Sequence, residues 1–183
     1  MLKHVRRPLA ALTLLFLSGC HTHTEHIYSL QDVTNQTTIE PDKYLGLIYV
    51  KGVVIGITQS DYINTQRIIA TVKPNGEIIE AWIDYHESGP DSPVQFIAAN
   101  DANARPLKIH ALTHEHSTRY TEASEEVAID LPPDYLQTHL NSGFDIRLEG
   151  RRGTRSVVFA YDYIQGFRAK LLIAQACIRA KTC

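Results

Sequence analysis

The chain has 183 residues, of which 44% are hydrophobic and 21% are charged, and its formal net charge at pH 7 is −2. This length and apolar content suffice for one domain with a single core of ordinary size. A chain without an excess of basic side chains is a poor match for a phosphate backbone, so the composition argues against a nucleic-acid partner.

The first residues have the pattern of a targeting segment. Lys3, Arg6 and Arg7 supply positive charge, and an apolar-dominated run of nine positions, Leu9 to Leu17, follows. This run is less than half of the roughly 20 apolar residues that a membrane-spanning helix needs. The sequence therefore predicts a leader that is removed rather than a transmembrane helix.

The leader ends in Leu17-Ser18-Gly19-Cys20, which resembles the lipobox of bacterial lipoproteins. The resemblance implies that residues 1–19 are cut away and that Cys20 carries a diacylglyceryl group and an N-acyl group. Several acyl chains hold a protein durably on a membrane without a spanning helix. The alternative is an ordinary secreted protein with a cysteine near its cleavage site.

The residue after the lipobox bears on the localisation. In bacterial lipoproteins an aspartate directly after the cysteine commonly marks retention at the inner membrane, whereas this chain has His21 there. The resemblance thus implies an envelope protein anchored at the outer membrane and facing the periplasm. Removing residues 1–19 takes away three of the 18 basic residues and none of the 20 acidic ones, so the remainder carries a formal charge of −5.

Two cysteines remain once Cys20 is lipidated. An oxidising periplasm would permit Cys177 and Cys183 to form a disulfide, and two free thiols near the C-terminus are the alternative. On a continuous helix, residues six apart in sequence point about 240° from each other, so the bridge requires the helix to unwind after about Arg179.

The remaining elements follow in chain order. The polar segment 20–36 is predicted to be a lipidated N-terminus and flexible tether, and a single globular domain is predicted over 37–183. Residues 44–57 are rich in β-branched residues and glycine, which favours one strand with bends. The runs 67–73 and 77–85 predict a hairpin across Pro74-Asn75-Gly76, because Asn-Gly supplies the positive φ angles of tight turns.

Further strands and two helices complete the expected fold. A strand is expected over 95–99, before the turn-forming residues 100–103, and apolar residues alternate with polar ones in three more segments, namely 107–111, 127–131 and 144–148. Residues 145–149 and 156–161 are expected to pair across a tip that carries Arg151, Arg152 and Arg155. A solvated, charged hairpin end is the expected role of these arginines, and binding of a phosphate or a carboxylate partner is the alternative.

Two helices are predicted by their ends and by their apolar spacing. Pro132 starts the first, of about three turns, which Gly143 ends. The second has an apolar stripe at helical spacing, formed by Ile164, Phe167, Leu171, Ala174 and Ile178. The predicted class is α+β, mainly an antiparallel sheet with a short helix and a C-terminal amphipathic helix packed on it; a helix lying on the membrane is the alternative.

Two segments of the globular part carry a second, looser resemblance. Leu131-Pro132-Pro133-Asp134-Tyr135-Leu136 and Tyr163-Ile164-Gln165-Gly166-Phe167 are similar to segments of proteobacterial lipoproteins that have a strand-rich body and a C-terminal helix. The resemblance implies no activity.

The most suggestive polar pattern is a pair of histidines. His114 and His116 flank Glu115, and on a strand residues i and i+2 point to the same side, so both imidazoles could reach one metal ion. A site would need a third ligand, such as one of His86, Glu87 and Asp84. The alternative is a solvent-facing strand whose opposite face belongs to the core.

Motifs of common hydrolases and nucleotide-binding enzymes do not occur in the sequence. The pairs Glu125-Glu126 and Asp84 with Glu87 could supply an acid and a base, but isolated carboxylates are far more often surface groups. We therefore expect a lipid-anchored envelope protein that binds an envelope component without catalysis and without a cofactor beyond its lipid. A metal-binding lipoprotein using His114 and His116 is the second hypothesis, and an envelope enzyme is the third.

Overall fold

A computed structural model of the protein describes residues 28–59, 62–89, 94–116 and 123–180, with the backbone alone for 57–59 and 114–116. The elements in chain order are α1 (Leu30–Gln36), β1 (Thr38–Asp42), β2 (Leu47–Lys51), β3 (Ile55–Gln59), β4 (Tyr62–Val72), β5 (Ile78–Gly89), β6 (Phe96–Asp101), β7 (Pro106–Leu107), β8 (Ile109–His116), β9 (Ala123–Leu131), α2 (Tyr135–Thr138), β10 (Phe144–Gly150), β11 (Gly153–Phe159) and α3 (Tyr161–Ala180).

The strands form two antiparallel sheets. The larger sheet has the order β1-β2-β4-β5-β9-β8, and the smaller has the order β11-β10-β6-β7. Strands β2 and β3 occupy successive parts of the same edge of β4, because β2 pairs with its C-terminal residues and β3 with its N-terminal residues. The predicted α+β class with a mainly antiparallel sheet is confirmed.

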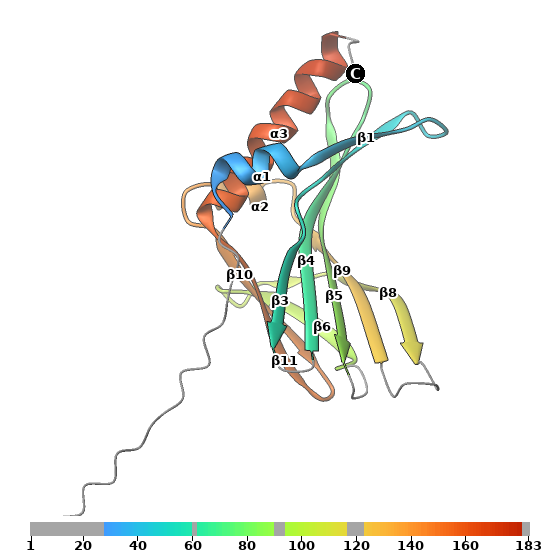
Figure 1. The fold of residues 1–183 in the computed structure, drawn as a ribbon, viewed down its shortest axis with the longest axis vertical. Coiled ribbons are helices and arrows are strands. Elements are labelled where there is room, and N and C mark those ends of the chain that lie inside the picture. The colour runs from blue at the N-terminus through green and yellow to red at the C-terminus, as the bar shows by residue number, and fades with distance from the viewer. Residues whose placement is uncertain (1–27, 60–61, 90–93, 117–122, 181–183) are drawn as a thin grey trace, which may run out of the picture.

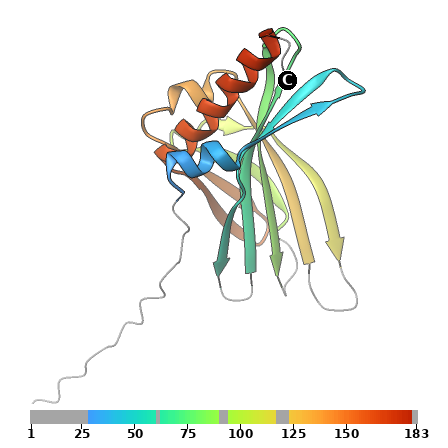
Figure 2. The ribbon, with the colours of Figure 1, turned by 45° about the horizontal axis from the view of Figure 1, so that its top comes forward.

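The two sheets and α3 share one core. Figures 1 and 2 show the smaller sheet and α3 lying on the same side of the larger sheet, with α3 directly following β11. Tyr85 of the larger sheet meets Phe96 of the smaller one edge to face, with ring centroids 5.5 Å apart. Phe159 of β11 and Tyr163 of α3 also pack together, with ring centroids 4.7 Å apart. The core is therefore a single cluster to which both sheets and the helix contribute.

The C-terminal helix α3 forms with the apolar face that the sequence pattern predicts. All five residues of its predicted apolar stripe are buried, namely Ile164, Phe167, Leu171, Ala174 and Ile178. Their spacing places them on one face of α3, and that face packs against the larger sheet rather than outward. Among the described helices, none combines the length and the apolar content that crossing a bilayer requires.

The hairpin of β4 and β5 forms where the sequence predicts it, but with a different turn. Lys73 N donates to Glu77 O at 2.8 Å, and Gly76 N donates to Lys73 O at 2.8 Å. Gly76 has a φ of +84°, whereas Asn75 is not among the residues with positive φ. A single glycine in the left-handed region therefore closes the turn, as in hairpins that combine a type I turn with a glycine bulge.

Two predicted elements differ from the structure in length. The stretch 44–57 contains two separate strands, β2 and β3, instead of one bent strand. The helix predicted from Pro132 to Ser142 is reduced to the four residues of α2. Asp134 makes no side-chain capping hydrogen bond at its start. Beyond its end, Leu140 O accepts a hydrogen bond from Gln165 Nε2 of α3 at 2.6 Å, so a tertiary contact replaces a further helical turn.

Residues 30–36, which were expected to belong to the tether, form the helix α1. Ser29 and Asp32 make a capping box that satisfies backbone donors at the start of this helix. Helix α1 packs on α3 at Gly166, where a Cβ would lie only 2.6 Å from Leu30 O and 2.7 Å from Val33 Cβ. Residues 30–36 of the segment predicted as a tether thus form a helix packed on α3, and the tether over the preceding residues stays a prediction.

Candidate functional site

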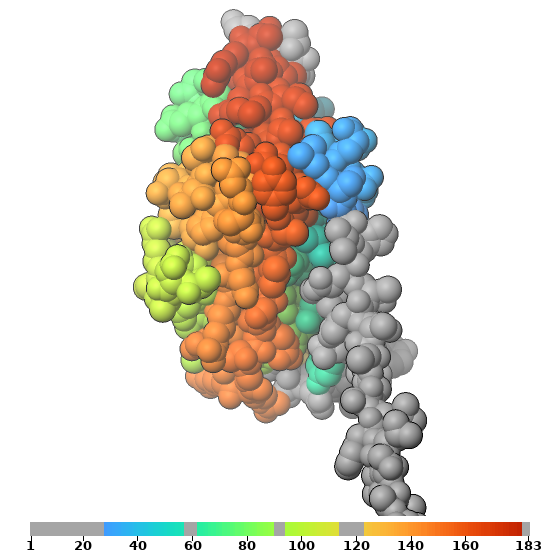
Figure 3. Space-filling model, turned by 90° about the vertical axis from the view of Figure 1, so that its left-hand side faces the viewer, coloured from blue at the N-terminus to red at the C-terminus, as the bar shows by residue number. Residues whose placement is uncertain are grey.

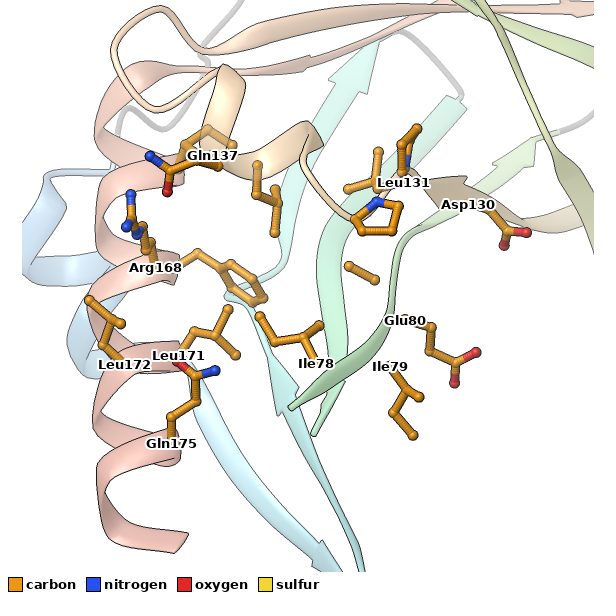
Figure 4. Close-up of a pocket in the computed structure, with 16 residues that line it drawn as sticks. Ile78, Ile79, Glu80, Asp130, Leu131, Gln137, Arg168, Leu171, Leu172 and Gln175 are labelled. Carbon is orange, nitrogen blue, oxygen red and sulfur yellow. The ribbon is translucent and has the colours of Figure 1, made fainter. Parts of the chain in front are cut away.

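A groove lies between α3, α2, the first residues of β5 and the end of β9. Its volume is about 390 Å³. Figure 3 shows the face on which α3, α2 and the tip of the β4–β5 hairpin meet, and Figure 4 shows the lining side chains. The lining residues are Ile78, Ile79, Glu80, Ala81, Asp130, Leu131, Pro132, Pro133, Leu136, Gln137, Ile164, Phe167, Arg168, Leu171, Leu172 and Gln175.

The groove exists because β9 ends opposite Ala81 and leaves the first residues of β5 without a neighbouring strand on that side. The pairing of β5 with β9 ends at Ala81 and Leu131, whereas β5 continues back to Ile78 on its β4 side. Pro132 and Pro133 follow Leu131, and proline has no N–H to donate to a neighbouring strand. Residues 78–80 of β5 therefore form an open strand edge within the described part of the sheet.

Helix α3 forms the opposite wall of the groove. Its buried residues Phe167 and Leu171 lie at the base, and Leu172, with 53% of its surface exposed, lies at the rim. Gln175 Nε2 donates to Gly76 O at 2.7 Å, which ties the helix to the hairpin turn. That bond holds one end of the groove, and the segment leading into α2 forms the other.

Apolar surface is exposed around the open edge. Ile78 is 38% exposed and Ile79 is 43% exposed, so these two residues and Leu172 leave apolar area in contact with water on both sides of the groove. Contiguous exposed apolar surface beside a concavity is typical of binding sites.

The charged side chains at the rim, Glu80, Asp130 and Arg168, differ in the partners that they bind. Glu80 accepts a hydrogen bond from Thr71 Oγ1 at 3.0 Å, and Asp130 lies 2.9 Å from His110 Nε2. Lys108 Nζ is also 3.8 Å from Asp130. Arg168 has no ion pair within the part of the chain that the structure describes. Among the described charges at the rim, Asp130 therefore has basic partners, whereas Glu80 is bound only by a neutral hydroxyl and Arg168 has no ion pair.

The histidines predicted as metal ligands lie elsewhere, on β8 at the far edge of the larger sheet. The backbone of His114 is in register with Glu125, and that of His116 is in register with Ala123. Their side chains lie outside the described part of the structure. Among the groups that it does describe, no three His, Cys, Asp or Glu side chains come together as a metal site. The metal hypothesis stays a prediction.

Residues that the sequence assigns to the anchor and the disulfide are only partly described. The leader, Cys20 and His21 lie outside the described residues, as does Cys183. Cys177 lies on α3 and takes part in a disulfide bond. Both cysteines that could be its partner are outside the described residues, so its pairing with Cys183 stays a prediction.

The acidic pairs considered as an acid and a base are regrouped by the fold. Glu87 and Glu125 are neighbours across β5 and β9, with only 4% and 1% of their surfaces exposed. Arg155 Nε and Nη2 donate to the two oxygens of Glu87 at 2.6 and 2.7 Å. The Glu125 carboxylate accepts from the backbone N–H groups of Gln95 and Phe96 at 2.7 and 2.8 Å.

These contacts give both carboxylates a role in joining the two sheets. Burial, and then the charge of Glu87, raises the pKa of Tyr85, whose hydroxyl donates to Glu87 Oε2 at 3.2 Å. The hydrogen bond to Glu87 raises the pKa of Arg155. The other two residues considered lie apart from this pair: Asp84 binds Arg67 at 2.7 Å and Glu126 accepts from Thr113 at 3.2 Å.

The sequence did not predict the groove. Its residues come from three segments whose proximity depends on the fold, and the local signal was the Pro-Pro pair directly after an alternating strand. The chain matches no known family model and no curated protein sequence. The geometry of its own residues is therefore what supports a function.

Proposed function

We propose that this protein is a lipid-anchored lipoprotein of the bacterial cell envelope that binds another envelope component at the groove between α3 and β5, without catalysing a reaction. The lipobox-like residues Leu17-Ser18-Gly19-Cys20 support the anchor, with diacylglyceryl and N-acyl groups on Cys20. His21 supports placement at the outer membrane, facing the periplasm, by resemblance to other lipoproteins.

The observation that carries the binding role is the combination of an apolar concavity with an open strand edge. The exposed residues Ile78, Ile79 and Leu172 lie together around one groove, and apolar surface grouped beside a concavity is typical of a binding site. The buried carboxylates are held in ion-pair and backbone hydrogen bonds between the sheets, so they support the fold.

Site-specific photocrosslinking in intact cells tests the binding role. A photoreactive amino acid at Leu172, in the groove, is compared with the same residue at Leu112, which is 49% exposed on β8 and lies outside the groove. We expect a discrete crosslinked species from Leu172 and none from Leu112. Equal labelling at both positions, or none at Leu172, would contradict the groove as the binding site.

A further inference from the structure

We propose that the groove binds an extended peptide of an envelope protein as an added strand on β5, with a carboxylate of the peptide on Arg168. This inference rests on the proposed function, in which the groove is a docking site, and it specifies what docks there and how.

The open edge of β5 sets the first requirement on the occupant. Residues 78–80 continue the strand past the end of β9, and Pro132 and Pro133 keep the chain itself from extending the ladder. Any ligand that fills the groove covers this edge and removes water from its backbone groups. A peptide in extended conformation can hydrogen-bond to them, whereas an acyl chain leaves them without partners.

The walls of the groove set the second requirement. An added strand lies about 4.8 Å from its neighbour, and its side chains point alternately to the two faces of the sheet. One set of alternate side chains would enter the space between β5 and α3, where Phe167, Leu171 and Leu131 form an apolar base. The fitting peptide therefore has apolar residues at every second position.

The third requirement comes from charge. Asp130 is paired with His110 and Lys108, and Glu80 is bound only by the neutral hydroxyl of Thr71, so Arg168 is the cationic group of the rim without an ion pair in the described part of the chain. A guanidinium beside a partly desolvated groove favours a carboxylate, which it can bind through two hydrogen bonds. The peptide accordingly carries an acidic side chain or its own C-terminal carboxylate next to the apolar stretch.

The test uses the mature lipidated protein in nanodiscs and a displayed library of short random peptides. Selection on the parent protein, with counter-selection on the Arg168→Glu variant, yields candidate probes. We expect enriched peptides with apolar residues at alternate positions and a carboxylate. A fluorescein-labelled selected peptide should bind about tenfold more weakly to Arg168→Glu, as expected for the loss of one charge-assisted contact.

Matched variants and a blocked peptide separate strand addition from other modes. Ile79→Glu should weaken binding, while Ile97→Glu should not, because Ile97 is an exposed isoleucine on β6 of the other sheet. Circular dichroism confirms that both variants fold. Methylating alternate backbone nitrogens of the peptide should abolish binding, and hydrogen exchange of residues 78–80 should slow when the unmodified peptide binds.

Four results would overturn the inference. The first is that selection enriches no common peptide pattern, and the second is that the methylated peptide binds equally well. The third is that a fluorescent fatty acid binds to the groove and displaces the peptide. The fourth is self-association that Ile79→Glu abolishes, which would replace the peptide with a second copy of the chain. In each case a crosslink at Leu172 would still support the groove as a docking site, so the two proposals fail separately.

Discussion

At the scale of single residues, two buried tyrosines differ in whether their hydroxyl groups make hydrogen bonds. Tyr163 donates its hydroxyl to Val53 O at 2.7 Å and accepts from Ile68 N at 3.3 Å. Tyr135 is equally buried, yet its hydroxyl has no hydrogen-bond partner within the described residues. Removing the two hydroxyls should therefore have different consequences for stability.

Tyr163→Phe should lower the free energy of unfolding by about 1–3 kcal/mol, because the carbonyl of Val53 and the N–H of Ile68 would each lose a buried hydrogen bond. Tyr135→Phe should leave it unchanged or raise it, because no bond is lost. Urea denaturation at pH 7 measures both. Equal destabilisation by the two substitutions would contradict this assignment.

Tyr135 also predicts how stability depends on pH. Burial, and then the nearby Asp101, raises the pKa of Tyr135 from 10.0 to about 12. Above pH 10 the unfolded chain loses the phenolic proton while the folded chain keeps it, so the folded state loses stability as the pH rises from 10 to about 12. Tyr135→Phe should make this decline shallower in urea denaturation series. An unchanged slope would mean that Tyr135 ionises normally.

Breaking the Glu87–Arg155 ion pair should lower the free energy of unfolding strongly. Arg155→Met would leave the carboxylate of Glu87 buried without its cation, which should lower the free energy of unfolding by about 3 kcal/mol. Lys73→Met is the matched control, because the Lys73–Glu77 pair is exposed to solvent and should contribute little to the free energy of unfolding. Adding Glu87→Gln to Arg155→Met should recover part of the loss. Similar effects of the two single substitutions would show that Glu87 is solvated.

At the scale of elements, the helices and strands that were predicted correctly are those whose sequence signal lies within one short segment. The β4–β5 hairpin, the β10–β11 pair and α3 all follow from turn residues and apolar spacing within one segment. Arg155 shows where this fails: the tip of β10 and β11 was expected to carry solvated arginines, yet Arg155 binds a carboxylate 68 residues away in the chain. Helix α1 was missed because seven residues form a stable helix only against a partner.

That dependence on a partner makes Gly166 of α3 critical for α1. Gly166→Ala raises the helix propensity of α3, but the new methyl group would collide with Leu30 O and Val33 Cβ of α1. We expect a net loss of about 1 kcal/mol or more and faster hydrogen exchange across residues 30–36. The control Ala176→Gly, on an exposed part of α3, should cost about 1 kcal/mol through propensity alone and leave exchange in α1 unchanged. Unchanged exchange in Gly166→Ala would show that α1 adapts to the methyl group.

At the scale of the whole molecule, the groove could not be predicted from any single segment of the sequence. The groove needs the early end of β9, the continuation of β5 and the docking of α3, and each of these is fixed by a different part of the chain. The Pro-Pro pair indicated the end of a strand, but only the sheet order shows that this end exposes the edge of β5. The predicted anchor depends on local signals alone, a leader and its processing site, and it stays a prediction because those residues lie outside the described part of the chain.

The proposed anchor and the fold should also be separable, because Tyr28 and Val33, the first described residues that join the core, lie several positions beyond Cys20. Cys20→Ala removes the thiol that would carry the diacylglyceryl group. We expect it to lose incorporation of labelled fatty acid and to move from the membrane to the soluble fraction, because the leader's apolar run is too short to hold as a span. Thermal unfolding of the purified variant, followed by circular dichroism, should have the same midpoint as the lipidated protein. Continued membrane attachment with fatty-acid labelling would rule out Cys20 as the anchor, whereas a lowered midpoint would mean that the lipid stabilises the folded domain.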